Sequence, residues 1–344
     1  MKRYLALAEG YSDDVHYGKT TYGVVHYAPD PVVAVLDSTR AGETLEGIPI
    51  VGTVAAALAY EPTVALVGVA VAGGRLPPVW RGILRDAIGA GLDVEAGMHE
   101  FLADDPELAA LAREHGVELR DYRRPPSGLS VASGANLALA AEVVLTVGSD
   151  CAVGKKTVAV ELDRAARARG VRSVFVPTGQ TGIMIAGWGI AVDAVVSDFL
   201  AGAGERLVVE GAERGDLLFV EGQGSIIHPQ FSGVTLGLYH GCAPHVLVLV
   251  HRAGDTELEG APGHPILPLA ELVEIYERLA LPVRPARVAA VALNTAALDK
   301  EGARAAIAAA AAETGLPAAD PVRFGPDLLL DAVLAALPSG ITRR

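Results

Sequence analysis

Residues 141–163 have the sequence AEVVLTVGSDCAVGKKTVAVELD. The Val-rich run at 143–147 is too short for a helix, and Gly148 ends it at a turn. From Lys155 onward apolar residues recur among polar ones as in a helix, whose first N–H groups would point back into the preceding loop. Strand, Gly-bounded loop and helix in this order predict a phosphate-binding loop.

The predicted loop carries the groups that hold a di- or triphosphate. Backbone N–H groups, the positive end of the helix dipole and the ammonium groups of Lys155 and Lys156 would converge on one anion. We therefore predict that the cofactor phosphates are bound by Gly148, Ser149, Asp150, Cys151, Ala152, Val153, Gly154, Lys155, Lys156 and Thr157.

The loop departs from the usual P-loop pattern in two ways. Five residues, not four, separate Gly148 from Gly154. This longer form, GSDCAVGK, resembles the loop of dethiobiotin synthetase, but Lys156 stands where the magnesium-binding Thr would be and Thr157 follows one place later. A second ammonium group repels Mg²⁺, so we expect phosphate binding without ATP hydrolysis and name no metal ligand.

Composition limits the classes of protein to consider. Of 344 residues, 51% are hydrophobic and 20% are charged, which favours a compact α/β protein over a disordered one. The net charge of −13 disfavours nucleic acid and anionic membranes as partners. Two cysteines, Cys151 and Cys242, make no disulfide framework, and no apolar run is long enough to span a membrane. We expect a soluble cytoplasmic protein and a homo-oligomer.

The chain length predicts two domains, and the charged, Pro-rich residues 121–128 mark their boundary. Before it, strands at 32–36, 64–69 and 117–119 alternate with helices at 54–60, 84–91 and 106–115. This β-α alternation predicts a Rossmann-like parallel-sheet domain at 1–125, without a G-x-G-x-x-G dinucleotide motif. Residues 37–42 follow a strand and fit a ligand loop or a plain turn equally well, and 18–21 fit a surface turn.

The second domain, 126–344, is predicted to be a P-loop NTPase-like three-layer α/β/α domain. After a strand at 173–176, the residues Thr178, Gly179, Gln180 and Thr181 suit a substrate loop, and residues 190–200 fit a helix. A buried strand at 217–220 delivers Glu221 beside the phosphate loop, where carboxylates often take part in proton transfer or metal binding.

Three further polar residues follow predicted strands. His228 lies on the loop after Glu221 and is a rival candidate for the base. Arg252 ends the strand at 246–251 and would suit a substrate carboxylate. Asn294 ends the strand at 288–293, where related P-loop proteins often contact the base of a nucleotide.

The segments GSDCAVGKKT, VPTGQTGIMIAGWGIAVDAVVSDFLAG, FVEGQGSIIHPQFSGVTLGLYHG and VLVHRAG resemble the two-domain family associated with D-glutamate N-acetyltransferase, over nearly the full chain. The resemblance implies acetyl-CoA as donor, an acidic amino acid as acceptor and acetyl transfer to its amino group. Glu221 is then the expected base with His228 as rival, and residues 178–181 and Arg252 would bind the substrate.

Two other functions remain open from the residues alone. A ligase or kinase would use ATP with Mg²⁺ on Thr157 and Glu221, and a non-catalytic protein would bind a nucleotide or CoA without turnover. Cys151 could form an acyl-enzyme, but direct acetyl transfer needs fewer steps.

Overall fold

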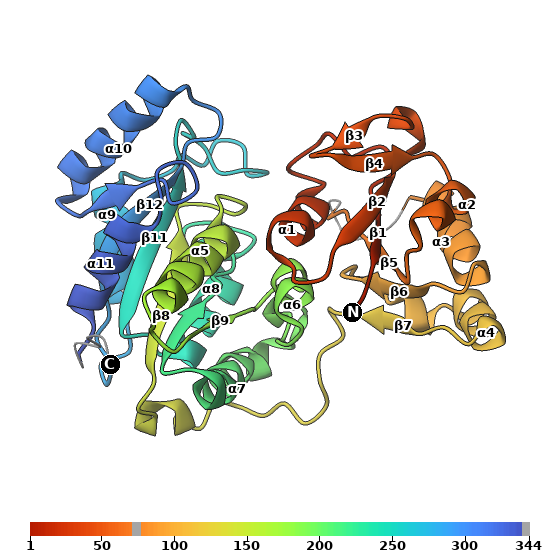
Figure 1. Ribbon diagram of the computed structural model, residues 1–344. Coiled ribbons are helices and arrows are strands. Elements are labelled where there is room, and N and C mark those ends of the chain that lie inside the picture. The colour runs from red at the N-terminus through yellow and green to blue at the C-terminus, as the bar shows by residue number, and fades with distance from the viewer. Residues whose placement is uncertain (71–76, 339–344) are drawn as a thin grey trace. The chain divides into compact units, whose positions relative to one another are not determined.

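The computed structural model describes residues 1–70 and 77–338 and divides the chain into two compact units (Figure 1). The first unit comprises residues 1–125 together with 180–194, and the second comprises 126–179 and 195–344. Both are α/β units built on mainly parallel sheets, as the alternation of strands and helices predicts. Within the described residues no helix is long and apolar enough to cross a membrane.

The first unit contains a seven-stranded sheet in the order β3-β4-β2-β1-β5-β6-β7, in which only the β3–β4 pair is antiparallel. Its strands are β1 (Tyr4–Leu7), β2 (Val32–Leu36), β3 (Thr44–Leu45), β4 (Ile48–Val51), β5 (Val64–Val67), β6 (Asp93–Ala96) and β7 (Leu119–Asp121). Its helices are α1 (Lys19–Tyr27), α2 (Val54–Ala57), α3 (Val79–Gly89), α4 (Pro106–His115) and α6 (Gln180–Ala186), with 3₁₀ turns η1 (Ser38–Arg40), η2 (Leu58–Tyr60), η4 (Leu102–Asp104) and η6 (Val192–Ala194).

Two hydrophobic cores cover the two faces of this sheet. Because strand side chains alternate between faces, Leu5 of β1 joins the core that contains Trp80 of α3, and Tyr4 joins the core that contains Val24 of α1. Met184 of α6 belongs to the second of these cores.

The expected surface turn at 18–21 is wrong, because α1 begins at Lys19 and buries Thr20 and Thr21. The backbone N and Oγ1 of Thr21 donate to the carbonyl of Gly68 after β5, at 2.9 and 3.0 Å. Gly18 permits this packing, since a Cβ there would lie 2.7 Å from the carbonyl oxygen of Asp14.

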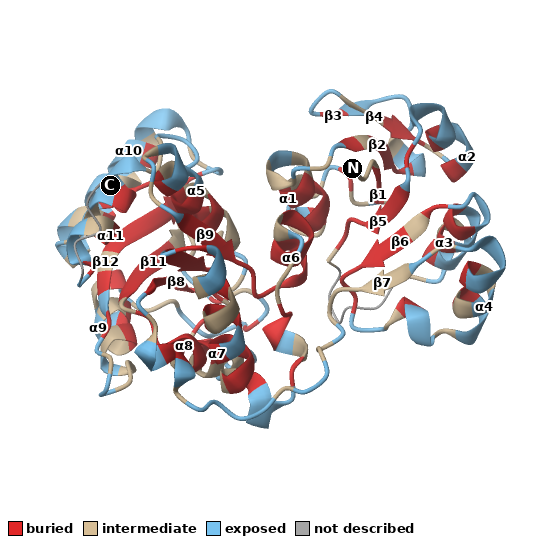
Figure 2. Cartoon of the chain, turned by 60° about the horizontal axis from the view of Figure 1, so that its bottom comes forward, coloured by how far each residue is buried: buried red, intermediate tan, exposed pale blue. Residues whose placement is uncertain are grey.

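The second unit has a parallel six-stranded sheet in the order β13-β12-β11-β8-β10-β9. Its strands are β8 (Glu142–Gly148), β9 (Ser173–Val176), β10 (Leu217–Val220), β11 (Val246–Arg252), β12 (Arg287–Asn294) and β13 (Ala318–Ala319). Its helices are α5 (Lys155–Ala168), α7 (Ser197–Arg214), α8 (Ser232–Cys242), α9 (Leu269–Arg278), α10 (Lys300–Thr314) and α11 (Asp327–Ala336), with the 3₁₀ turn η5 (Ala135–Ala138). In Figure 2, α5 and α11 lie on one side of the sheet and α7 and α8 on the other, which is the three-layer arrangement.

Residues 180–200 differ from the sequence prediction. The helix expected at 190–200 is replaced by the short turn η6 and by α7, which begins at Ser197. Residues 180–194 pack with the first unit instead of the second. The buried side of α6, with Ile183 and Met184, explains this, because Met184 enters a core built from the strands of the first sheet and α1.

Candidate functional site

The strand order of the second unit brings three strand ends together around the predicted phosphate loop. Strand β8 lies between β10 and β11, with Leu145 opposite Val220 and Gly148 opposite Val250. Parallel strands present their carboxyl ends at one edge of a sheet, and this is where open α/β sheets place their ligands. Residues following β10 and β11 therefore lie next to the loop 148–154.

The loop turns back sharply before α5 begins at Lys155. Ala152 has φ +51° and Gly154 has φ +114°, both in the left-handed region, and a non-glycine residue there indicates a tightly determined backbone. A Cβ on Gly148 would lie 2.7 Å from the carbonyl of Asp150 and 2.8 Å from Nζ of Lys155, so this tight curl requires glycine. The N-terminus of α5 then faces the loop with N–H groups that have no partner within the helix.

Side chains cap three successive backbone carbonyls at the start of the loop. The hydroxyl of Tyr276 donates to the carbonyl of Gly148 at 2.7 Å, and Oγ of Ser225 donates to that of Ser149 at 3.1 Å. Lys155 Nζ donates to the carbonyl of Asp150 at 2.6 Å. Lys155 is 6% exposed, so its ammonium group is held against the loop before any ligand arrives.

Lys156 and Thr157 occupy the next two positions of α5 and are both half-buried. Successive helical residues point in different directions, so they cannot both take the place that the hydroxyl of a P-loop Ser or Thr occupies. The chain thus keeps a lysine at the position where magnesium-binding P-loops place their hydroxyl.

Glu221 follows β10 and is 6% exposed. One carboxylate oxygen, Oε2, accepts hydrogen bonds from the backbone N–H groups of Thr178 at 3.0 Å and Gly179 at 3.1 Å. Thr178 Oγ1 donates to the backbone carbonyl of Glu221 at 2.6 Å. Glu221 therefore links the end of β10 to the loop after β9 and stabilises that loop through its negative charge.

Gln223 belongs to the same arrangement, although sequence reasoning did not single it out. Its Nε2 donates to Oγ1 of Thr178 at 3.0 Å. The single hydroxyl proton of Thr178 is already given to Glu221, so Thr178 must accept here and the amide orientation of Gln223 follows. Gly179 lies against both side chains, since a Cβ there would be 2.7 Å from Nε2 of Gln223 and 3.5 Å from Oε1 of Glu221.

His228 is completely buried, and both of its ring nitrogens have partners. Nδ1 accepts from the backbone N–H of Gln230 at 3.2 Å, which leaves the proton on Nε2, and Nε2 donates to the carbonyl of Glu259 at 3.0 Å. A ring with these partners has no free lone pair for a proton from a substrate.

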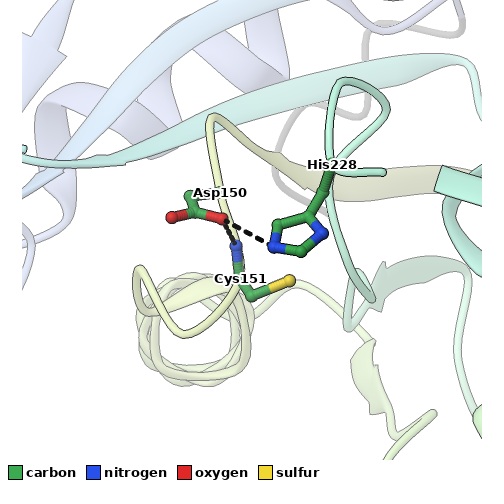
Figure 3. Close-up of side chains that lie close together, drawn as sticks. All are labelled: Asp150, Cys151 and His228. Carbon is green, nitrogen blue, oxygen red and sulfur yellow. Dashed lines mark hydrogen bonds and ion pairs between the residues drawn. The ribbon is translucent and has the colours of Figure 1, made fainter. Parts of the chain in front are cut away.

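Figure 3 shows His228 beside Asp150 and Cys151 of the phosphate loop. One ligand atom from each residue lies within 4.8 Å of the others, a spacing that could hold a metal ion. The carboxylate of Asp150, however, accepts from the backbone N–H groups of Cys151 at 2.6 Å and Glu259 at 2.7 Å. Both ring nitrogens of His228 are in use, and the hydrogen bonds that Asp150 and His228 make with the backbone of Glu259 join the 253–265 loop to the phosphate loop.

Arg252 is occupied by two carboxylates of its own unit. Its Nε donates to Asp255 at 2.6 Å and a terminal nitrogen contacts Glu259 at 3.3 Å. Burial alone would lower the pKa of Arg252, but the hydrogen bond and charge of Asp255, with the charge of Glu259, raise it above its ordinary value. A substrate carboxylate would therefore have to compete with these partners.

The remaining predicted residues have separate structural roles. Asn294 uses its side-chain oxygen to accept from the backbone N–H of Ala296 at 3.1 Å, which closes the turn after β12. Thr178 and Gly179 stay with the second unit, whereas Gln180 and Thr181 begin α6 in the first. Gln180 accepts from Arg123 at 2.9 Å, and Oγ1 of Thr181 lies 2.8 Å from Oγ1 of Thr20.

Sequence reasoning missed the residues that support the loop from outside. Tyr276 lies on α9, where its position in an amphipathic helix indicates only core packing. His251 precedes Arg252 and its Nδ1 lies 2.9 Å from Oγ of Ser149, while burial lowers the pKa of this histidine. Of these residues, only Ser225 and Gln223 could have been identified as site candidates from the sequence, because both follow the same buried strand as Glu221.

Family models match each of the two units and describe the same two types of fold. Residues 130–330 match the family model described as a "Domain of unknown function (DUF1611_C) P-loop domain", and residues 37–125 match the "Domain of unknown function (DUF1611_N) Rossmann-like domain". The chain belongs to the DUF1611 family. A crystal structure of a DUF1611 family protein from Anabaena variabilis is 44% identical, covers 97% of this chain and 100% of that one, and superposes with a TM-score of 0.93.

Two curated proteins that are similar to this chain carry an enzyme name. A protein of Tritonibacter scottomollicae named D-glutamate N-acetyltransferase is 36% identical over 95% of this chain and 97% of that protein. One from a Pseudoalteromonas species with the same name is 34% identical over 77% of this chain and 79% of that protein. The expected family resemblance is confirmed.

Proposed function

We propose that this DUF1611 protein is an N-acetyltransferase that moves the acetyl group of acetyl-CoA to the amino group of an acidic amino acid, with D-glutamate as the first acceptor to test. The observation that carries the proposal is the shared name of two relatives over most of the chain. The geometry of the phosphate loop adds independent support for the donor.

The loop suits the diphosphate of CoA. Acetyl-CoA supplies an activated thioester, and its diphosphate needs N–H groups and cations but no hydrolysing metal centre. Lys155 and Lys156 bring two positive charges to the N-terminus of α5, where the helix dipole adds to them. Residues 148–157 would hold the diphosphate.

Acetyl transfer further requires a base that takes the proton of the acceptor's ammonium group. The hydrogen bonds of His228 leave it no free lone pair, which favours Glu221 over His228. Glu221 lies beside the phosphate loop, whereas the thioester is at the far end of the pantetheine arm. Glu221 therefore serves as base if the bound arm folds back over the loop, and otherwise it orients the loop at 178–179.

The experiment that tests the proposal measures release of free CoA from acetyl-CoA with a panel of D- and L-amino acids, in EDTA and in Mg²⁺. We expect release that depends on an acidic acceptor and persists in EDTA, and a mass increase of one acetyl group on the acceptor. Turnover of ATP that requires Mg²⁺ would support a ligase or kinase instead. Tight CoA binding without turnover of any amino acid would support a binding protein.

A further inference from the structure

The root of the phosphate loop, Gly148 to Asp150, is held by the backbone hydrogen bond from the N–H of Ser149 to the carbonyl of Val250 at 2.9 Å and by side chains that lie outside the loop. Tyr276 reaches from α9 to the carbonyl of Gly148, and Ser225 reaches from the segment after β10 to the carbonyl of Ser149. Ser149 Oγ is also paired with Nδ1 of His251 at the end of β11. Three separate elements thus contact two successive loop residues.

Of these three side chains, Tyr276 connects the loop to a second segment of the unit. Its hydroxyl donates to Gly148 and also accepts from the backbone N–H of Ile226 at 3.1 Å, so it bridges the loop to the segment after β10. The side chain is fully buried, and burial raises the pKa of Tyr276 to about 12. The hydroxyl thus acts as a donor to the loop and as an acceptor from the segment after β10.

This bridge matters for anion binding because a loop binds phosphate only when its N–H groups are preset around the ligand. The peptide that joins Gly148 to Ser149 is planar, and its N–H donates to the carbonyl of Val250. With its carbonyl held by Tyr276, both polar groups of this peptide are fixed where the chain enters the loop. The strained Ala152 and the left-handed Gly154 then follow in a conformation that other residues must maintain.

We propose that Tyr276 is a positioning residue that holds the phosphate loop in its ligand-binding shape before the anion arrives. The inference rests on the proposed function only in taking CoA as the natural ligand. It predicts that removal of this one hydroxyl weakens the binding of any diphosphate by more than the loss of a comparable buried hydroxyl elsewhere in the unit.

The chain offers a matched control for this test. Tyr239 on α8 is equally buried, and its hydroxyl donates to a backbone carbonyl, that of Tyr276, at 2.9 Å. Among the residues that the structure describes, the hydroxyl of Tyr239 makes no hydrogen bond to 148–154. Tyr276→Phe should lower the melting temperature at least as much as Tyr239→Phe. Tyr239→Phe leaves one buried carbonyl without its donor, whereas Tyr276→Phe also leaves the N–H of Ile226 without its acceptor.

The deciding experiment titrates CoA and inorganic pyrophosphate calorimetrically into wild type, Tyr276→Phe, Tyr239→Phe and Ser225→Ala, in EDTA and well below the lowest melting temperature. We expect Tyr276→Phe to bind both ligands about tenfold more weakly or worse, Ser225→Ala to lose affinity in the same direction, and Tyr239→Phe to bind like wild type. Wild-type affinity in Tyr276→Phe and Ser225→Ala, or an equal loss in both tyrosine variants, would overturn the inference. Failure of the wild type to bind either ligand would instead overturn the phosphate-loop assignment, and the inference with it.

Discussion

His245 links the stability of the second unit to pH through a single hydrogen bond. Its Nδ1 accepts from the backbone N–H of Val143 at 3.0 Å, an arrangement that requires this nitrogen to be unprotonated. Burial, with the nearby charge of Arg284, lowers the pKa of His245 below its ordinary value, against a smaller opposing effect of Glu142. The unfolded chain therefore binds a proton at a higher pH than the folded chain does.

The sign of the effect follows from this difference. As the pH falls below about 6.5, the unfolded state gains a proton that the folded state resists, so the free energy of unfolding decreases. In His245→Asn the side-chain oxygen takes the place of Nδ1 but does not titrate. We expect the urea midpoint, followed by circular dichroism, to fall less between pH 7.5 and 5.5 in His245→Asn than in wild type. The exposed His264→Asn is the control, and an unchanged pH dependence in His245→Asn would exclude this role.

Glu221 allows the chemistry of the carboxylate to be separated from its structural role. Glu221→Gln keeps an oxygen that can accept from Thr178 and Gly179 but removes basicity. If Glu221 is the base, turnover should fall about 10²-fold or more while CoA affinity stays near wild type. Steady-state kinetics and calorimetry together measure both quantities.

Glu205→Gln is the matched control for that substitution. Glu205 is 8% exposed and accepts from the backbone N–H of Ser133 at 2.9 Å, so it caps a backbone segment in the same unit without touching the phosphate loop. Glu205→Gln should leave turnover and CoA affinity unchanged. A Glu221→Gln protein that loses CoA affinity in step with turnover would show that the carboxylate orients the site and is not the base.

At the scale of elements, the sequence predicts best where hydrophobic pattern and boundary residues agree. The expected strand at 32–36 and helix at 106–115 coincide with β2 and α4, and Pro106 with the Asp105 cap explains the sharp start of α4. Strand β1 has only four residues, and α1 carries few apolar positions, so neither produced a clear periodicity. Their formation depends on burial between elements that are distant in sequence.

In the candidate site, too, the sequence predicts local features better than contacts between distant segments. The phosphate loop and Glu221 were predictable because local order, strand then loop, determines their place. The partners of Arg252 and His228 could not be predicted, because Asp255 and Glu259 come from a loop whose path depends on tertiary packing. Residue type identified these side chains as polar and well placed, but only the structure shows that other groups of the chain already occupy them.

The phosphate loop and α5 together provide a test of metal independence. If Lys156 supplies the charge that Mg²⁺ supplies in an ATPase, CoA should bind in EDTA, and Lys156→Thr should weaken that binding by about 1–3 kcal/mol. The substitution recreates a Lys-Thr pair at positions 155 and 156 and should favour binding of ATP with Mg²⁺. Calorimetric titration of CoA and ATP into both proteins, with Mg²⁺ and with EDTA, measures the difference. ATP binding by the wild type only in Mg²⁺, with no CoA binding in EDTA, would sink the metal-free interpretation.

At the scale of the whole molecule, the chain passes from the second unit into the first at residues 179/180 and returns at 194/195. The crossing comes directly after Gly179, whose N–H is held by Glu221 in the second unit. The segment 180–194 is anchored in the first unit by Arg123, which donates to the carbonyl of Gly97 at 2.7 Å, to Gln180 at 2.9 Å and to Asp193. One arginine thus links both ends of this segment to Gly97, the residue that follows β6.

Loss of this arginine should therefore loosen residues 180–194 more than any other part of the first unit. In Arg123→Ala the side chain of Gln180 and the carboxylate of Asp193 lose their partner, while Met184 keeps its place in the hydrophobic core. We expect hydrogen–deuterium exchange in 180–194 to rise about tenfold or more, because the free energy of local opening falls by at least the net value of about one hydrogen bond. The neighbouring Arg124 pairs with the exposed Asp104 at 2.6 Å, so Arg124→Ala is the control and should leave this exchange unchanged. Equal exchange in wild type and Arg123→Ala would mean that the apolar contacts of α6 alone hold the segment.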